Sequence, residues 1–297
     1  MISSSVLTSS RAAGATLLVS GLLLASAAQA QISTPAASPK STVTQRVGLT
    51  DVTITYYRPS AKGRTIYGTV VPFGKRWRTG ANSTTTIKFS DDVTLEGKKV
   101  PAGEYGIYTI PNKTEWLVVL NKSTKQGADV DNFKDDQDVA RFSVKPYKLG
   151  NTVETFTIGF SDLTPATANI DIQWALTGVK FKLATDVDPK VMAQIDEKVI
   201  KGTAATANDY AAAAVYYYEN NKDMKQALEW IQKANANDPK FWNLHHEAKI
   251  KMKMKDYKGA MASAEQSRKL ALDAKNADYV KMNEDLAAEA KKNSGAK

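Results

Sequence analysis

The chain has 297 residues, a formal net charge of +9 and no cysteine. Without cysteine it cannot form disulfide bonds, carry a lipid anchor on a cysteine, or bind zinc through thiolates. The charge is unevenly distributed, since residues 31–82 contain eight Lys and Arg but a single acidic residue, Asp51. We therefore expect the positive field of the molecule to concentrate in this segment.

The first thirty residues have the pattern of a secretory signal peptide. Arg11 precedes an apolar run at residues 15–27, and a short Ala-Gln-Ala sequence ending at Ala30 has the small residues of a cleavage site. We expect cleavage after Ala30 and a periplasmic or secreted mature protein. No later stretch approaches the roughly 18 apolar residues that a membrane-spanning helix needs, so no span is expected after cleavage. Residues 31–42 are rich in Pro, Ser and Thr, which predicts a disordered leader.

Residues 43–187 have the pattern of β-strands. Short runs rich in Val, Ile, Thr and aromatic residues recur, and several alternate strictly, as in ETFTIGF (154–160) and NIDIQWAL (169–176). Turn residues separate these runs, and no helical segment lies between them. The pattern predicts a mainly antiparallel β-sandwich domain over residues 43–187.

The period becomes helical after an Asp-Pro pair at residues 188–189, which suits a helix start. KDMKQA (222–227) recurs as KDYKGA (255–260), 33 residues later. The first copy fits the tetratricopeptide pattern at Tyr218, Ala227, Ile231, Ala234 and Pro239. We predict an all-α helical-repeat domain over residues 188–297. Two interpretations stay open: the helices present a concave surface to a protein partner, or they brace the sandwich.

Three motifs of the β part carry a family resemblance: GRTIYGTVVPFGKRWRTGAN (63–82), VPAGEYGIYTIP (100–111) and EWLVVLNK (115–122). Over roughly residues 38–185 the chain strongly resembles the exported bacterial family known as domain of unknown function 2911. The resemblance implies an N-terminal signal peptide, a β domain and, as in some members, tetratricopeptide-like helices after it. It implies no activity.

The histidines limit the possible chemistry. His245 and His246 are the only two, and both lie in the helical part. Adjacent residues on a helix point about 100° apart, so these two cannot chelate one metal ion together. We expect them to lie at the surface or to line a groove. A β domain without His or Cys excludes Ser-His-Asp and Cys-His mechanisms there, and we assign no catalytic residue, metal site or cofactor.

An acidic stretch, DVDNFKDDQD (129–138), offers the oxygen ligands that calcium prefers in Asp129, Asp131 and Asp135. Phe133 breaks the spacing of a calcium-binding loop, and no closing glutamate follows. A solvated loop is the favoured interpretation.

Arginine is concentrated in one short segment. Four of the eight arginines lie within residues 58–78, beside only two lysines, whereas the rest of the chain has four arginines and thirty lysines. Guanidinium groups form bidentate bonds with carboxylate, phosphate or sulfate. Alternation along an extended segment directs Trp77 to the core and its two arginine neighbours to one surface. We predict an anion-binding site formed by Arg58, Arg64, Arg76 and Arg78.

Two alternatives compete with this site. The arginines can instead stabilise the fold by pairing with acids such as Asp91 and Asp92 or by bonding loop carbonyls. The β domain can also be a carboxylate-dependent hydrolase of glycans or cell-envelope material, using two of Asp91, Asp92, Glu104 and Glu115 across a cleft.

The function that the sequence favours is that of an exported, non-enzymatic binding protein. Its expected ligand is an anionic glycan or an acidic peptide, and the helical repeats are expected to contact a protein partner. The hydrolase is the alternative, and a third interpretation makes the helices the working part and the β domain a passive scaffold. Nucleic acid is not expected, because the basic charge forms one patch rather than a long stripe.

Overall fold

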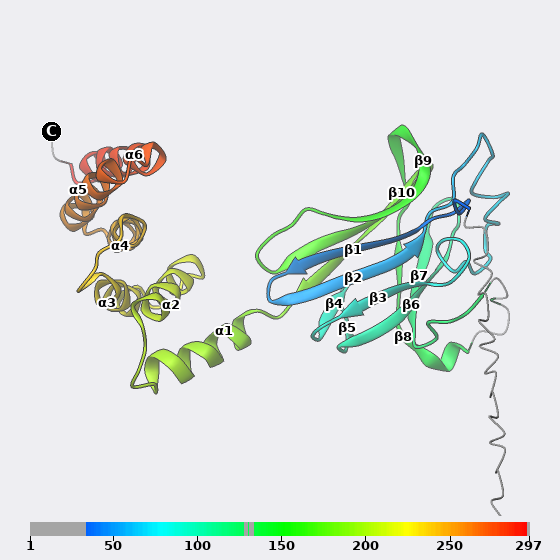
Figure 1. Cartoon of the computed structure of the whole chain (residues 1–297), viewed down its shortest axis with the longest axis horizontal. Coiled ribbons are helices and arrows are strands. Elements are labelled where there is room, and N and C mark those ends of the chain that lie inside the picture. The colour runs from blue at the N-terminus through cyan, green and yellow to red at the C-terminus, as the bar shows by residue number, and fades with distance from the viewer. Residues whose placement is uncertain (1–33, 128–129, 131–133, 296–297) are drawn as a thin grey trace, which may run out of the picture. The chain divides into compact units, whose positions relative to one another are not determined.

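The computed structural model of the chain describes residues 34–127, 130 and 134–295. Among these residues, ten strands lie between positions 40 and 185, and six α-helices follow between positions 188 and 293 (Figure 1). Neighbouring strands run antiparallel throughout both sheets. The predicted order, an antiparallel β region followed by a helical region, is confirmed.

The strands form two sheets. The larger sheet has the order β1 (Lys40–Val47), β2 (Thr50–Tyr57), β3 (Thr85–Phe89), β6 (Gly103–Ile110), β7 (Trp116–Asn121) and β8 (Asp138–Val144). The smaller sheet has the order β5 (Lys98–Val100), β4 (Val93–Leu95), β10 (Thr167–Thr185) and β9 (Tyr147–Ser161). A short 3₁₀-helix, η1 (Asp135–Gln137), precedes β8. The longest connection within the larger sheet is residues 58–84, called the β2–β3 loop below.

Both sheets contribute to one hydrophobic core. Alternate residues of β2 and β3 are buried, among them Ile54 and Ile87. Phe156 of β9 and Ile172 of β10 belong to the same core. This sharing follows from the alternation in the sequence, because successive side chains of a strand point to opposite sides of its sheet.

The first strand begins earlier than the sequence predicts. β1 starts at Lys40, so the last three residues of the predicted leader, residues 31–42, are strand. The hydroxyl groups of Thr42 and Thr44 lie 3.2 Å from those of Thr55 and Thr53 on β2. Threonine suits strands but gives no apolar–polar alternation, which is why the pattern missed this start. The predicted signal peptide, residues 1–30, lies outside the described residues.

The helical region has its own hydrophobic cluster. Its elements are α1 (Asp188–Ile195), the π-helix η2 (Asp196–Ile200), α2 (Ala207–Glu219), α3 (Met224–Asn235), α4 (Phe241–Lys253), α5 (Tyr257–Asp273) and α6 (Ala277–Asn293). α2 packs against α3, α4 against α5, and α5 against α6. In the part of the chain that the structure describes, no helix is both long enough and apolar enough to cross a membrane.

The internal sequence repeat corresponds to two equivalent helix starts. Asp223 and Asp256 occupy the same position in KDMKQA and KDYKGA, and they cap α3 and α5. Asp223 accepts a hydrogen bond from the backbone amide of Lys225 at 2.8 Å, and Asp256 accepts one from that of Gly259 at 2.9 Å. Each carboxylate satisfies backbone donors that the first turn of a helix leaves without partners.

Candidate functional site

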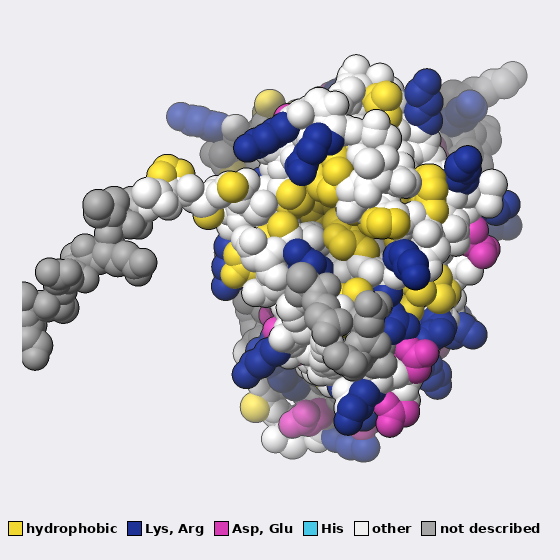
Figure 2. Space-filling model, turned by 90° about the vertical axis from the view of Figure 1, so that its right-hand side faces the viewer, with side chains coloured by type: hydrophobic (Ala, Val, Ile, Leu, Met, Phe, Trp, Pro, Cys, Tyr) yellow, Lys and Arg dark blue, Asp and Glu magenta, His cyan; other side chains and the backbone are white. Residues whose placement is uncertain are grey.

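The β2–β3 loop carries all four arginines of the predicted site. Residues 58–84 contain six Lys and Arg and no Asp or Glu. The loop lies at the end of the β region that faces the viewer in Figure 2, where Lys and Arg side chains surround an apolar area. The local excess of positive charge is therefore a surface feature of this end.

Trp77 anchors the loop to the larger sheet and to the core. Its backbone amide donates to the carbonyl of Thr109 on β6 at 2.8 Å, and the amide of Thr109 donates back at 2.9 Å. The indole stacks on Trp174, with ring centroids 6.0 Å apart, and meets Phe156 edge-on at 5.3 Å. Its Nε1 donates to the carbonyl of Gly80 at 2.9 Å. The prediction that Trp77 faces the core is confirmed.

Thr79 holds the backbone just after Arg78 in an unusual conformation. It has a φ of +56° and is fully buried. A β-branched residue in this left-handed region costs about 1–3 kcal/mol, which the surrounding bonds must offset. Its hydroxyl lies 3.1 Å from that of Thr109, and its carbonyl accepts the Thr85 hydroxyl at 2.5 Å. These contacts fix the backbone from which the Arg78 side chain projects.

Arg58 and Arg64 bond to the protein's own carbonyl groups. Nε of Arg58 donates to the carbonyl of Phe156 on β9 at 3.1 Å, and its NH2 group donates to the hydroxyl of the next residue at 2.9 Å. Arg64 donates to the carbonyls of Ser60 and Ala61, in the same loop, at 2.7 and 3.0 Å. These two arginines therefore follow the structural alternative named above, in which the guanidinium groups bond backbone carbonyls.

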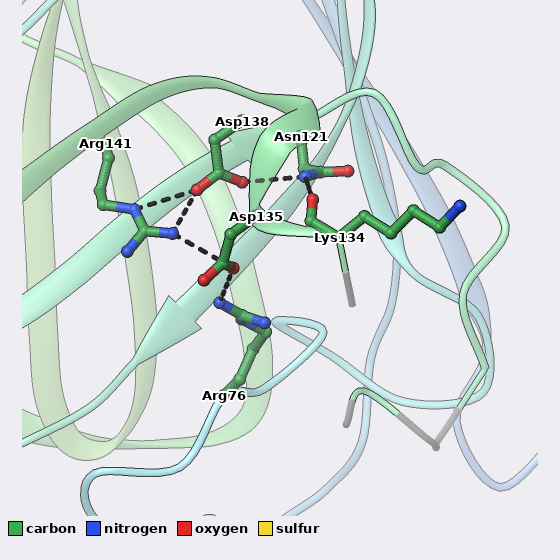
Figure 3. A network of polar contacts seen from close by, with 6 residues as sticks. All are labelled: Arg76, Asn121, Lys134, Asp135, Asp138 and Arg141. Carbon is green, nitrogen blue, oxygen red and sulfur yellow. Dashed lines mark hydrogen bonds and ion pairs between the residues drawn. The ribbon is translucent and has the colours of Figure 1, made fainter. Parts of the chain in front are cut away.

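Arg76 belongs to a network of charged and polar groups, shown in Figure 3. Its NH2 group donates to Asp135 in η1 at 2.7 Å, and Arg141 of β8 lies 3.3 Å from the same carboxylate oxygen. Arg141 also donates to Asp138, whose second oxygen accepts the side-chain amide of Asn121 at 2.8 Å. The network ties the β2–β3 loop to the segment before β8.

Asp135 is thus bonded by two arginines. The hydrogen bond from Arg76, followed by the positive charges of both guanidinium groups, lowers the pKa of Asp135. The other two acids of the possible calcium site, Asp129 and Asp131, lie outside the described residues. Within the described ranges, no group of three or more His, Asp or Glu side chains is arranged to hold a metal ion.

Arg78 differs from the other three arginines. Its side chain is partly buried, and Nε is shielded from solvent. No described residue forms a hydrogen bond or ion pair with its guanidinium group. Burial lowers the pKa of Arg78, which reflects a cation without a compensating charge nearby. The four arginines therefore have different surroundings, and Arg78 is the one of the four whose guanidinium group has no hydrogen-bond partner among the described residues.

The carboxylates considered for a hydrolase have separate surroundings. Asp91 forms an ion pair with Lys190, and hydrogen bonds from that lysine and from Ser90 lower the pKa of Asp91. Asp92 accepts a backbone amide in the turn before β6 at 2.8 Å. Two further acids lie elsewhere on the larger sheet: Glu104 opposite Lys88 on β3, and Glu115 in the β6–β7 turn. The arginines of the β2–β3 loop bond to neither Asp91 nor Asp92.

Comparisons with known proteins concern the β region. No curated protein and no solved structure matches the chain. One family model matches a segment of the chain, residues 38–183. This segment holds the whole β2–β3 loop and ends two residues before the end of β10, so the helices are not part of it. The family is described as Protein of unknown function (DUF2911).

Proposed function

We propose that the β region is an exported binding module that holds an anionic ligand on Arg78. The observation that supports this is the partly buried guanidinium of Arg78, to which no described residue brings a counter-charge or an acceptor. An uncompensated charge removed from water is destabilising, and a ligand carboxylate, phosphate or sulfate removes that penalty through two parallel hydrogen bonds.

The surroundings of Arg78 favour an anion in two ways. The β2–β3 loop supplies six positive charges and no negative one, which raises the local concentration of anions. The backbone around Arg78 is held on both sides, by the Trp77–Thr109 bridge and by the bonds of Thr79. A fixed backbone reduces the entropy that the side chain loses on binding.

We further propose that the two sheets form a β-sandwich and that the helices form a tetratricopeptide-like arm for contact with a protein partner. The shared core supports the sandwich. The repeated helix caps and the small buried residues Ala227, Ala234, Ala260 and Ala264 support the repeat, since small residues allow close helix packing.

Replacing Arg78 tests the proposed site directly. The probes are polygalacturonate, a glycan with carboxylates, and polyglutamate, an acidic peptide. Arg78→Gln should weaken binding of the recognised polymer at least about tenfold in calorimetric titration, because a charge-assisted hydrogen bond contributes about 1.5–3 kcal/mol. The free energy of unfolding should stay equal or rise, because an uncompensated charge is removed.

The matched control is Arg46→Gln. Arg46 is exposed on β1 and lies 3.9 Å from Asp51, a surface pair that contributes little to stability. The variant Arg46→Gln removes the same charge as Arg78→Gln, but outside the β2–β3 loop. Binding should therefore be almost unchanged. An equal loss in both variants, or unfolding of Arg78→Gln, would overturn the proposal. So would failure of the unmodified protein to bind either polymer.

A further inference from the structure

The helical region contains a cavity of about 670 Å³ between side chains of α2, α4, α5 and α6. Its lining includes Tyr218 of α2, three residues of the α4 face (His245, Lys249 and Lys253), and Asp285 and Glu289 of α6. His245, Lys249 and Lys253 follow one another at intervals of four residues, so they lie along one face of α4. One small ligand can therefore contact more than one of them.

His245, a largely buried residue, offers a hydrogen-bond acceptor to this cavity. The residue is 5% exposed, and its Nδ1 lies 2.9 Å from the side-chain oxygen of Asn283. The amide nitrogen of Asn283 donates to the hydroxyl of Ser267 at 2.7 Å and to the carbonyl of Tyr279 at 2.6 Å. Both amide donors of Asn283 are thus used, so its oxygen must accept, and the proton of the imidazole sits on Nδ1.

The other ring nitrogen, Nε2, then carries a lone pair. No described residue forms a hydrogen bond with it. Burial and the nearby charge of Lys249 lower the pKa of His245, which keeps the ring neutral at pH 7. A ligand that uses this position must bring an N–H or O–H donor.

Lys249 and Lys253 add positive charge without a paired carboxylate among the described residues. Their ammonium groups lie 5.0 and 4.9 Å from the centre of the Tyr218 ring. Lys253 also donates to the backbone carbonyl of Tyr218 and to the side chain of Asn221, both of which are neutral. Two cations are therefore stabilised by groups that carry no formal charge.

The acids of α6 set the charge that the cavity accepts. Asp285 forms an ion pair with Lys281, whereas Glu289, the other acid of the lining, forms no salt bridge with a described residue. The positive charges of Lys249, Lys253 and Lys281 exceed the negative charges of Asp285 and Glu289 by one. This balance suits a ligand with one negative charge and disfavours a polyanion.

We propose that this cavity binds a carboxylate with a hydrogen-bond donor next to it, the carboxylate at Lys249 and Lys253 and the donor on Nε2 of His245. Met252, Met282 and Leu286 give the rest of the ligand an apolar surface. A free N-acylated amino acid and the carboxyl-terminal end of a peptide share this chemistry. The site is independent of Arg78, so either proposal can fail alone.

The test varies the ligand first, with the whole mature chain followed by NMR. The probes are acetylglycine, its methyl ester, which lacks the negative charge, and acetylsarcosine, which lacks the N–H group. Acetylglycine should bind and shift the Nε2 resonance of His245, whereas each of the other two should bind about tenfold more weakly. Acetyl-tetraglycine with a free carboxyl end distinguishes the two sources: tighter binding than acetylglycine identifies a peptide end, and weaker binding a small acid.

Lysine variants supply the protein side of the test. Lys249→Met should weaken acetylglycine binding about tenfold. Lys258→Met is the matched control, because Lys258 is exposed on α5, outside the cavity, and loses the same charge. Equal affinity for acetylglycine and acetylsarcosine, or an equal effect of the two lysine variants, would overturn the proposal. The ligand comparison decides the matter even if a variant folds poorly.

Discussion

Single arginines of the β2–β3 loop perform different tasks, although the sequence presents them as one cluster. Arg58 and Arg64 bond backbone carbonyls, and Arg76 bonds the carboxylate of Asp135. A long loop without regular structure leaves many carbonyl groups without backbone donors, and a guanidinium group brings five N–H donors to them. Much of the preference for arginine over lysine is therefore structural, and the anion-binding role that we propose falls on Arg78.

A second buried polar group in the loop makes a clear prediction for stability. The hydroxyl of Tyr67 is buried and bonds to no described residue, and burial strongly raises the pKa of Tyr67. Tyr67→Phe removes this group and should raise the free energy of unfolding by about 1 kcal/mol in urea denaturation. The control is Tyr56→Phe, which breaks a hydrogen bond to the carbonyl of Ile158 at 3.1 Å and should lower it by a similar amount. A lower stability of Tyr67→Phe would contradict this account.

The sequence predicts the direction of a side chain better than its partner. Alternation was enough to place Trp77 against the core. The partners of the arginines were beyond reach, because Arg58 bonds a residue 98 positions away and Arg76 one 59 positions away. Nothing in the local sequence separates Arg78 from its neighbours. His245 was expected at the surface or in a groove, and it does line the cavity of the helical region. Its buried bond to Asn283 was beyond reach, because that bond depends on the packing of α4 against α6.

At the scale of elements, the contact between the β2–β3 loop and η1 should depend on pH. Asp135 has a pKa below its usual value of 3.8 because of Arg76, so the contact is fully present above that value. Its stabilisation is lost as pH falls through the lowered pKa of the folded state. Asp135→Asn should remove this part of the acid sensitivity of unfolding below about pH 4. Identical profiles below pH 4 for the variant and the unmodified protein would show that the contact is unimportant.

The periodicity of the apolar residues predicted the type of each element, but it did not predict where each element begins and ends. Strict alternation predicted β9 and β10, and the change of period at residue 188 predicted the helices. The early start of β1 was missed because its threonines, which pair with threonines of β2, give no apolar–polar alternation in the sequence. The repeated KDxKxA sequence predicted a structural repeat, and the structure explains it through two aspartate caps.

At the scale of the whole molecule, the described residues of the β region and of the helical region form separate hydrophobic clusters that share no residue. Ile172 of the β core and Ile231 of the helical core are both almost fully buried, so replacing either by Ala should cost about 2–5 kcal/mol. We expect two transitions in scanning calorimetry, with Ile172→Ala lowering the midpoint of one and Ile231→Ala that of the other. A single transition lowered by both variants would show that the regions unfold as one unit.

The bridge between Trp77 and Thr109 has a consequence for solubility. β3 pairs with β6 only as far as Ile107. Beyond that point the β2–β3 loop lies beside β6 instead of β3: Trp77 pairs with Thr109, and the amide of Gly74 donates to the carbonyl of Pro111. The loop thereby closes a short open edge at the end of β6, where free backbone groups would invite pairing with another chain. Part of the segment that presents the arginines thus also protects the β region against edge-to-edge aggregation.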